Sequence, residues 1–244
     1  MILAAGLGTR LKPITDTMPK ALVEVGGIPM LEITIRYLKK SGIDRIVINL
    51  HHFPEQIRDF LKKKQNFGIE ILYSDESNAL LDTGGAIKKA ASLFDPDHPY
   101  ILMGVDILTD LDLTEMINFH NKNKPLVTLA VKNRPTSRSL LFDKNMKLEG
   151  WKNNQTGELK GIKTDKDSIA LGFSVIHIIE PEIFKLIHEE GSFSIIDLYL
   201  RLMKENKILG FRDDKSTWLE FGKIENIRKL ENEDRFKNII AALP

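Results

Sequence analysis

Cysteine is absent from the 244-residue chain. Its absence excludes disulfides, thiolate nucleophiles and cysteine-ligated metals, and it agrees with a reducing compartment. The sequence also lacks any apolar run close to the ~20 residues that a transmembrane helix needs. Its N-terminus has no basic segment followed by an apolar core and a cleavage site, as a signal peptide would. We therefore expect a cytoplasmic protein with no membrane partner.

An excess of charge of either sign is also missing. Lys and Arg total 35 against 34 Asp and Glu, which gives a formal net charge of +1. Such a balance gives no general reason to expect a nucleic-acid partner, and none is expected. Any phosphate ligand must therefore be bound by a local cluster of cations. With 42% hydrophobic and 28% charged residues, the composition is typical of a globular protein.

In the first half of the chain, short apolar runs alternate with amphipathic stretches. The run Arg45–Leu50, for example, is rich in β-branched residues, and an apolar face repeats along residues 29–40 between Pro29 and Gly42. This pattern predicts strands and helices in alternation, hence a Rossmann-like α/β domain whose mostly parallel central sheet is flanked by helices. The expected strands are 1–4, 45–50, 69–73, 100–103 and 126–131, and the expected helices 29–40, 54–64, 84–94 and 113–121.

The pattern changes after about residue 132, where β-rich segments predominate. We find no internal repeat, low-complexity tract or flexible linker, so residues 1–244 are expected to form one domain with a small β-rich insertion. The expected elements are a hairpin at 139–142 and 147–151, a polar loop at 153–168, a strand at 169–179, helices at 181–188 and 195–206, strands at 208–212 and 217–221, and a C-terminal helical segment.

A glycine-containing loop follows the first expected strand, with the sequence Ala4-Ala5-Gly6-Leu7-Gly8-Thr9-Arg10. In open α/β sheets, ligands bind beyond the carboxyl ends of the strands. Glycines let backbone N–H groups approach phosphate oxygens without interference from a Cβ atom. Arg10 and the later Lys20 would add two cations, which suit a triphosphate whose pyrophosphate must leave.

Two familiar phosphate-binding loops are excluded. A Walker A loop needs a Lys-Ser/Thr pair after its last glycine, and this loop has none. A dinucleotide fingerprint needs glycine or alanine at position 11, which is Leu11, and an acidic residue ~20 positions further on at the end of a second strand. A dinucleotide-dependent oxidoreductase is therefore disfavoured.

The loop belongs to a longer pattern, L-A-A-G-x-G-T-R-L-x-P-x-T-x-x-x-P-K-x-L-x-x-V-x-G-x-P-M over residues 3–30. This pattern resembles the signature of the sugar-1-phosphate nucleotidyltransferase family, and the resemblance continues along nearly the whole chain. It implies a glycosyltransferase-A-like fold. It further implies that residues 1–131 form a nucleotide-binding half, and that residues 132–244 bind the sugar phosphate and complete a metal site.

The resemblance also implies roles for individual residues. Residues 4–10 would bind the nucleotide, with Arg10 and Lys20 as catalytic cations, and Asp106 and Glu220 would hold Mg²⁺. Asp106 would in addition lie at the sugar phosphate. Independently of the resemblance, Asp106 follows an apolar strand, and Mg²⁺ prefers one or two carboxylates together with phosphate oxygens. The nucleotide's base and ribose would meet Asp82, Thr83, Gly84 and Gly85.

Two residues depart from the family pattern. Glu220 stands where the family usually has Asp, which keeps the charge but adds a methylene. Val175 stands where the family commonly has glycine, next to Ser174 in a strand close to the sugar. A branched side chain there would narrow or redirect the pocket, so the identity of the sugar cannot be carried over.

The implied reaction converts an NTP and a sugar-1-phosphate into an NDP-sugar and pyrophosphate. The attacking phosphate oxygen is already an anion, so the reaction needs no protein nucleophile, in agreement with the absence of cysteine. Within the family, the chain looks most like N-acetylmuramate-1-phosphate uridylyltransferases, with mannose- and heptose-1-phosphate guanylyltransferases as the alternative. A nucleotide-binding regulatory module that has lost catalysis is the rival from another class. The sequence leaves both a monomer and a homodimer open.

Overall fold

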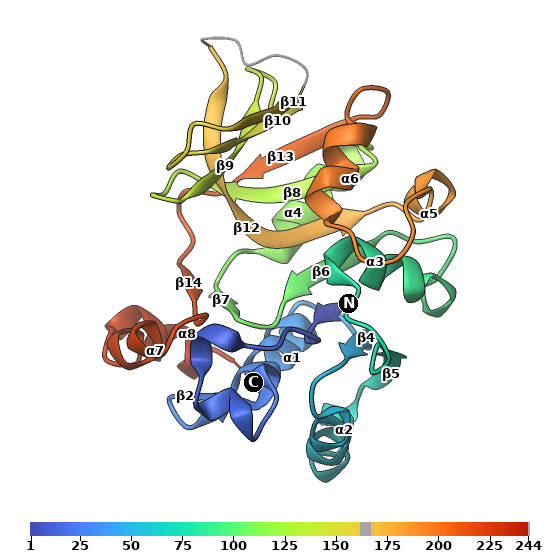
Figure 1. The fold of residues 1–244 in the computed structure, drawn as a ribbon. Coiled ribbons are helices and arrows are strands. Elements are labelled where there is room, and N and C mark those ends of the chain that lie inside the picture. The colour runs from blue at the N-terminus through green and yellow to red at the C-terminus, as the bar shows by residue number, and fades with distance from the viewer. Residues whose placement is uncertain (162–166, 244) are drawn as a thin grey trace. The chain divides into compact units, whose positions relative to one another are not determined.

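The computed structural model describes residues 1–161 and 167–243, which fold into two compact units (Figure 1). Unit 1 comprises Met1–Leu80, Met103–Asp112 and Ser216–Pro244, and unit 2 comprises Leu81–Leu102 and Leu113–Lys215. Each unit is assembled from separated stretches of the chain. The functional division at residue 131 stays a prediction. None of the helices within the described residues combines the length and apolarity needed to cross a membrane.

Unit 1 contains the parallel sheet that the alternating pattern predicts. Strand β1 (Ile2–Leu3) pairs in parallel with β4 (Arg45–Leu50) and with the end of β6 (Tyr100–Gly104), and β4 pairs in parallel with β5 (Glu70–Asp75). Five of the six residues of β4 are buried, as expected for a parallel strand covered on both faces. The carboxyl ends of these strands therefore meet at one edge, where the glycine loop begins.

The rest of unit 1 consists of helices and two short antiparallel pairs. Helix α1 buries the predicted apolar face through Leu31, Ile35 and Leu38. Pro29 is extended and precedes the helix instead of occupying its first position, which corrects the sequence-based expectation by one residue. The elements are β2 (Glu24–Val25) paired with β3 (Ile28–Pro29), β7 (Ile107–Thr109) paired with β14 (Trp218–Glu220), and helices α1 (Met30–Lys40), α2 (Pro54–Lys63), α7 (Ile224–Leu230) and α8 (Asp234–Ala241).

Unit 2 holds the predicted β-rich insertion. Its strands follow the order β11-β10-β9-β12-β8-β13 and are antiparallel except for β13, which runs parallel to β8. Helix α4 packs on β8, and α6 packs on α3 and β10. The elements are α3 (Asp82–Lys89), α4 (Leu113–Asn123), β8 (Val127–Lys132), β9 (Arg138–Phe142), β10 (Leu148–Asn153), β11 (Leu159–Gly161), β12 (Ile169–Ile179), α5 (Ile183–Leu186), α6 (Ile195–Leu202) and β13 (Ile208–Arg212).

Several boundaries in unit 2 differ from the sequence-based expectation. The expected polar loop at 153–168 contains strand β11, and its residues 162–166 lie outside the described residues. Helix α3 begins at Asp82, two residues early. Asp82 itself has a left-handed φ of 54°, and its side chain accepts a hydrogen bond of 2.6 Å from the N–H of Thr83. Asp tolerates this conformation better than most residues.

Val175 lies in a bulge of β12. Three residues, 174–176, stand opposite the single β8 residue Ala130, between the Phe173↔Val131 and His177↔Leu129 pairs. Val175 adopts φ +59° within this bulge. A β-branched residue there is a genuine outlier, because its Cβ substituents crowd the backbone. The bulge therefore stores backbone strain at the position where the resemblance implies glycine.

Gly85 fits its site only because it lacks a side chain. A Cβ atom on Gly85 would lie 2.4 Å from the carbonyl oxygen of Gly191. We expect Gly85→Ala to lower the free energy of unfolding by about 1–3 kcal/mol, since backbone must move to make room. Urea denaturation measures the change. Gly6→Ala, where nothing lies within 4 Å of the added Cβ, is the control, and equal stability of the two variants would contradict the prediction.

The strain at Val175 can be measured by comparing two substitutions. Val175→Gly and Val175→Ala both remove the branched side chain, but only glycine adopts φ +59° freely. We expect Val175→Gly to be more stable than Val175→Ala by about 1 kcal/mol in urea denaturation. If Val175→Ala proves equally or more stable, the bulge is not strained in the way proposed.

Candidate functional site

The backbone of the glycine loop is fixed where it leaves β1. The N–H of Ala4 donates a 2.7 Å hydrogen bond to Oδ1 of Asn49, and Nδ2 of Asn49 donates to Oε1 of Glu76 at 2.8 Å. Asn49 is 3% exposed and Glu76 is fully buried. Buried polar groups of this kind are stable only when they are hydrogen-bonded. The pair therefore ties the start of the loop to the ends of β4 and β5.

A second set of contacts holds the middle of the loop. The hydroxyl of Thr15 donates to the carbonyl oxygen of Gly8 at 2.8 Å, and Leu11, which is fully buried, donates its N–H to the same oxygen. Nε2 of His52 lies 3.0 Å from the carbonyl oxygen of Thr15. The side chain of Gln56 donates to the carbonyl oxygen of residue 17 at 2.9 Å. The segment after β4 thus serves as a support for the loop.

The two glycines of the loop have different reasons for lacking a side chain. Gly8 has φ +63°, and a Cβ there would lie 2.8 Å from Cγ2 of Thr15 and 3.0 Å from Cβ of Lys20. Gly8 therefore lets the loop fold back on itself. Around Gly6 nothing lies within 4 Å of the position of an added Cβ. Packing therefore does not require glycine at this position.

Two ion pairs join the predicted catalytic cations to the predicted metal ligands, all within unit 1. Nζ of Lys20 lies 2.5 Å from Oδ2 of Asp106, and the two side chains are 14% and 17% exposed. A guanidinium nitrogen of Arg10 lies 3.2 Å from Oε1 of Glu220, and these two side chains are 56% and 35% exposed. The structure thus brings together four side chains from three distant stretches of the chain.

The pairing of β7 with β14 brings Glu220 to this site. Glu220 stands opposite Ile107, and the N–H of Phe221 donates to the carbonyl oxygen of Asp106 at 3.0 Å. Gly222 adjoins the second ion pair, because a Cβ there would lie 2.7 Å from Oε1 of Glu220 and 2.8 Å from the Arg10 guanidinium. The lack of a side chain at Gly222 therefore leaves room for both partners.

The donor set at this site suits Mg²⁺. Within the part of the chain that the structure describes, no group of three or more His, Cys, Asp and Glu residues could hold a metal. Mg²⁺ does not need such a group, since it is usually bound by one or two carboxylates and by oxygens of substrate phosphates. Asp106 and Glu220, both partly accessible, provide that set.

The predicted nucleotide segment 82–85 lies in unit 2, at the start of α3. The N–H of Gly84 donates to the carbonyl oxygen of Phe193 at 2.9 Å, and a Cβ on Gly84 would overlap the Phe193 ring. Thr83 accepts a hydrogen bond from the N–H of Ile195 through its hydroxyl. Close packing on residues 191–195 therefore accounts for both glycines of the segment, and Asp82, which is exposed, is its most accessible side chain.

The predicted sugar-binding residues also lie in unit 2, in the bulge of β12. Ser174 is buried and Val175 half-buried. Nearby, burial lowers the pKa of His177 to about 3, so this imidazole is neutral at physiological pH. Its Nδ1 lies 2.8 Å from the hydroxyl of Tyr199. His177 thus has a structural role beneath the bulge.

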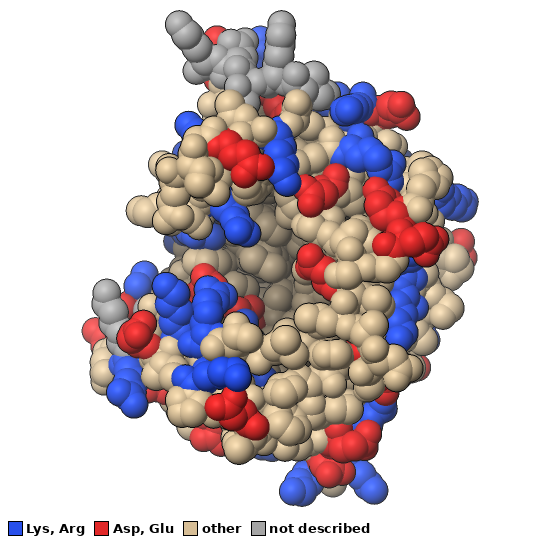
Figure 2. Space-filling model, viewed as in Figure 1, with Lys and Arg blue, Asp and Glu red and all other residues tan. Residues whose placement is uncertain are grey.

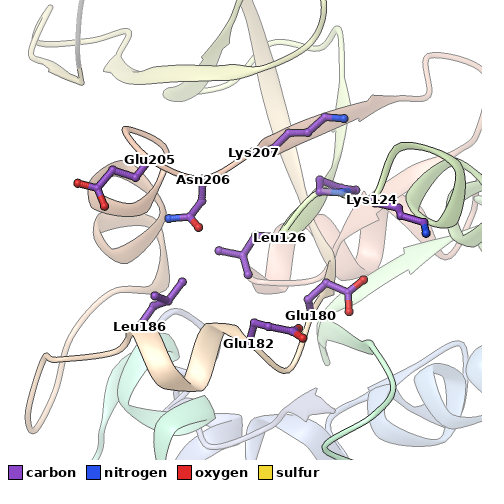
Figure 3. Close-up of a pocket in the computed structure, with 9 residues that line it drawn as sticks. Lys124, Leu126, Glu180, Glu182, Leu186, Glu205, Asn206 and Lys207 are labelled. Carbon is purple, nitrogen blue, oxygen red and sulfur yellow. The ribbon is translucent and has the colours of Figure 1, made fainter.

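A separate pocket of about 530 Å³ lies in unit 2, and none of the predicted site residues lines it (Figure 3). Glu180 lines this pocket, and its Oε1 lies 2.9 Å from Nε2 of the buried His120. Burial lowers the pKa of His120, although Glu180 opposes that effect. On the face seen in Figure 2, Lys and Arg side chains occur among Asp and Glu side chains, in line with the balanced net charge.

Some residues that support the site were not found from the sequence. Asn49 is the one polar residue among the five buried residues of β4, and that polar interruption was the available signal. Gln56 carries no such signal, because its partner lies far away in the chain. The adjacent histidines 51 and 52 each contact a backbone carbonyl oxygen.

Comparison with known proteins identifies the family of the chain. The nucleotidyl transferase family model matches residues 1–140. The N-acetylmuramate alpha-1-phosphate uridylyltransferase of Neisseria meningitidis is 32% identical over 239 residues, which cover 95% of this chain and 96% of that protein. The UTP–glucose-1-phosphate uridylyltransferase of Synechocystis is 29% identical over 92% of this chain, but the chain spans only 60% of that relative.

Solved structures of other proteins share the fold. A putative glucose-1-phosphate thymidylyltransferase from Bacillus anthracis superposes with a TM-score of 0.77 over 97% of both chains, at 19% identity. This likeness confirms the expected α/β fold. Because the family match covers more than half of the chain and the Neisseria relative aligns over almost its whole length, the chain belongs to the nucleotidyl transferase family, among the sugar-1-phosphate nucleotidyltransferases.

Proposed function

We propose that the protein transfers a nucleotidyl group from an NTP to a sugar-1-phosphate and releases pyrophosphate. The observation that carries the proposal is the cluster of two cations and two carboxylates beside the glycine loop in unit 1. The Neisseria relative makes UTP and N-acetylmuramate-1-phosphate the first substrates to test. Because the co-substrate would be a cellular NTP, we also propose that the enzyme works in the cytoplasm.

The proposed step is one displacement at the α-phosphorus of the NTP. An oxygen of the sugar phosphate forms a bond to this phosphorus, while the bond to the bridging oxygen breaks and its electron pair leaves with pyrophosphate. No proton needs to move, so no general base is required. Arg10 and the loop N–H groups would hold the β- and γ-phosphates, and Lys20 would stabilise charge on the α-phosphate. Positioning and charge neutralisation then supply the catalysis.

Asp106 and Glu220 would hold Mg²⁺, which when bound would neutralise phosphate charge at the reacting centre. Glu220 has the longer reach of a glutamate, and its carboxylate contacts Arg10 at 3.2 Å. In unit 2, Asp82 is the residue of the 82–85 segment that we propose for contact with the nucleotide. Ser174 and Val175 are proposed to contact the sugar.

The experiment that tests the function is a matrix of NTPs against sugar-1-phosphates, with pyrophosphate release as the readout. UTP and GTP with N-acetylmuramate-, glucose- and mannose-1-phosphate distinguish the uridylyltransferase from the guanylyltransferase alternative. A thermal shift by an NTP with Mg²⁺, without turnover of any pair, would support the regulatory module instead.

Substitutions at the ion pairs should remove turnover while leaving the fold intact. We expect Asp106→Asn and Glu220→Ala to abolish pyrophosphate release, and Lys20→Met to lower kcat by about 10²–10³-fold. Asp16→Asn is the matched control, because Asp16 lies shortly after the glycine loop and pairs with the exposed Lys12, outside both ion pairs of the site. Near-normal activity in Glu220→Ala would exclude it as a metal ligand.

The two loop glycines should respond in opposite ways to alanine. For Gly6→Ala we expect a stability change within about 0.5 kcal/mol and a KM for the NTP raised about tenfold, since the added methyl group would occupy the space left for phosphate. For Gly8→Ala we expect about 1–3 kcal/mol lower stability, since φ is +63° and Thr15 is too close. Urea denaturation and steady-state kinetics separate the two effects, and an unchanged KM in Gly6→Ala would contradict the ligand role.

A further inference from the structure

The two ion pairs match the proposed cations with the proposed metal ligands one to one. Lys20 contacts Asp106, and Arg10 contacts Glu220. The proposed function, on which this inference rests, needs all four side chains for other partners, because phosphate oxygens require the cations and Mg²⁺ requires the carboxylates. None of the four can fully serve its proposed ligand while it keeps its present partner.

Of the two ion pairs, Lys20–Asp106 costs more free energy to separate. Both of its side chains are more than four-fifths covered, and separating a partly buried pair leaves two poorly solvated charges. The Arg10–Glu220 pair is more exposed and longer, so solvent weakens it. Both pairs nevertheless cancel charge at the same place, beside the glycine loop.

We propose that substrate binding exchanges both ion pairs together, so that the site accepts a nucleotide with its metal and disfavours either alone. A metal-free nucleotide would take Lys20 and Arg10 but leave two unpaired carboxylates beside its phosphates. A metal alone would take the carboxylates but leave two unpaired cations beside it. When both bind, every charge regains a partner. The cost of separating the two ion pairs is then shared by the nucleotide and the metal.

The exchange makes an unusual prediction, that loss of a metal ligand strengthens binding of a metal-free phosphate compound. In Asp106→Asn, Lys20 has no carboxylate partner to give up, and no negative charge remains at position 106 to repel phosphate. We expect inorganic pyrophosphate in excess EDTA to bind Asp106→Asn about tenfold more tightly than wild type, measured by isothermal titration calorimetry. For Glu220→Gln, whose pair is more exposed, we expect about threefold.

The control is Asp16→Asn, which makes the same change of charge in the segment that follows the glycine loop without touching either pair. Its pyrophosphate affinity in EDTA should stay within about twofold of wild type, because its exposed pair with Lys12 contributes little. If Asp106→Asn binds pyrophosphate no more tightly than wild type, or if Asp16→Asn gains as much, the exchange is overturned.

A second measurement covers the possibility that Asp106→Asn does not fold, as judged by circular dichroism. Lys20→Met should bind Mn²⁺ in the absence of any phosphate more tightly than wild type, by about tenfold in electron paramagnetic resonance titrations, since Asp106 is then released. Unchanged Mn²⁺ affinity would overturn the exchange.

The outcome is distinguishable from failure of the proposed function. If wild type neither binds pyrophosphate with Mg²⁺ nor turns over any NTP and sugar-1-phosphate, the proposed function fails. If wild type does both and the variants show no gain, only the exchange fails.

Discussion

The pairing of Ile107–Thr109 with Trp218–Glu220 is the interaction on which the site depends. It joins segments about a hundred residues apart, and side chains reinforce it at its end, where the hydroxyl of Thr109 donates to the carbonyl oxygen of Thr217 and Asp110 accepts the N–H of Thr217 at 2.6 Å. Without this pairing, the carboxylate of Glu220 would have no fixed position relative to the glycine loop. A site made from charges of both signs needs that fixed position, because electrostatic stabilisation works only when the charged groups are held in place before the substrate arrives.

The need for fixed positions also explains why hydrogen bonds from neighbouring segments hold the glycine loop. Glycine-containing backbone is free to adopt many conformations, and ordering it costs conformational entropy. Asn49 and Glu76 offset that cost at the start of the loop, and Thr15, which His52 contacts in turn, does so at Gly8. A fully buried carboxylate such as Glu76 is tolerated only with hydrogen-bonding partners. The free-energy cost of burying Glu76 is offset here by the fixed position of Ala4, from which the N–H groups of the loop take their own positions.

Features that depend on local pattern could be predicted from the sequence, and features that depend on a distant partner could not. Runs of apolar residues gave β4, β12 and β13 with their observed bounds, since burial along a strand is visible in consecutive residues. Strand β7 has three residues and forms only against β14, so no periodicity identifies it. Gly84 shows the same limit: the motif predicted contact with a nucleotide, but its tight packing against Phe193 depends on a contact more than a hundred residues away in the chain.

This difference explains why the chemistry was easier to predict than the substrate. The transfer step depends on the number and sign of charges, and these survive when aspartate is replaced by glutamate at residue 220. Recognition of a sugar depends on shape. At Val175 the side chain adds volume while the backbone keeps the positive φ that suits glycine, inside a bulge where three residues stand opposite one. Because the strained backbone is retained, the replacement changes the space available beside it without a compensating change in the strand. A sugar that contacts Val175, as proposed, would therefore have to fit a space narrower than the one that glycine would leave on the same backbone.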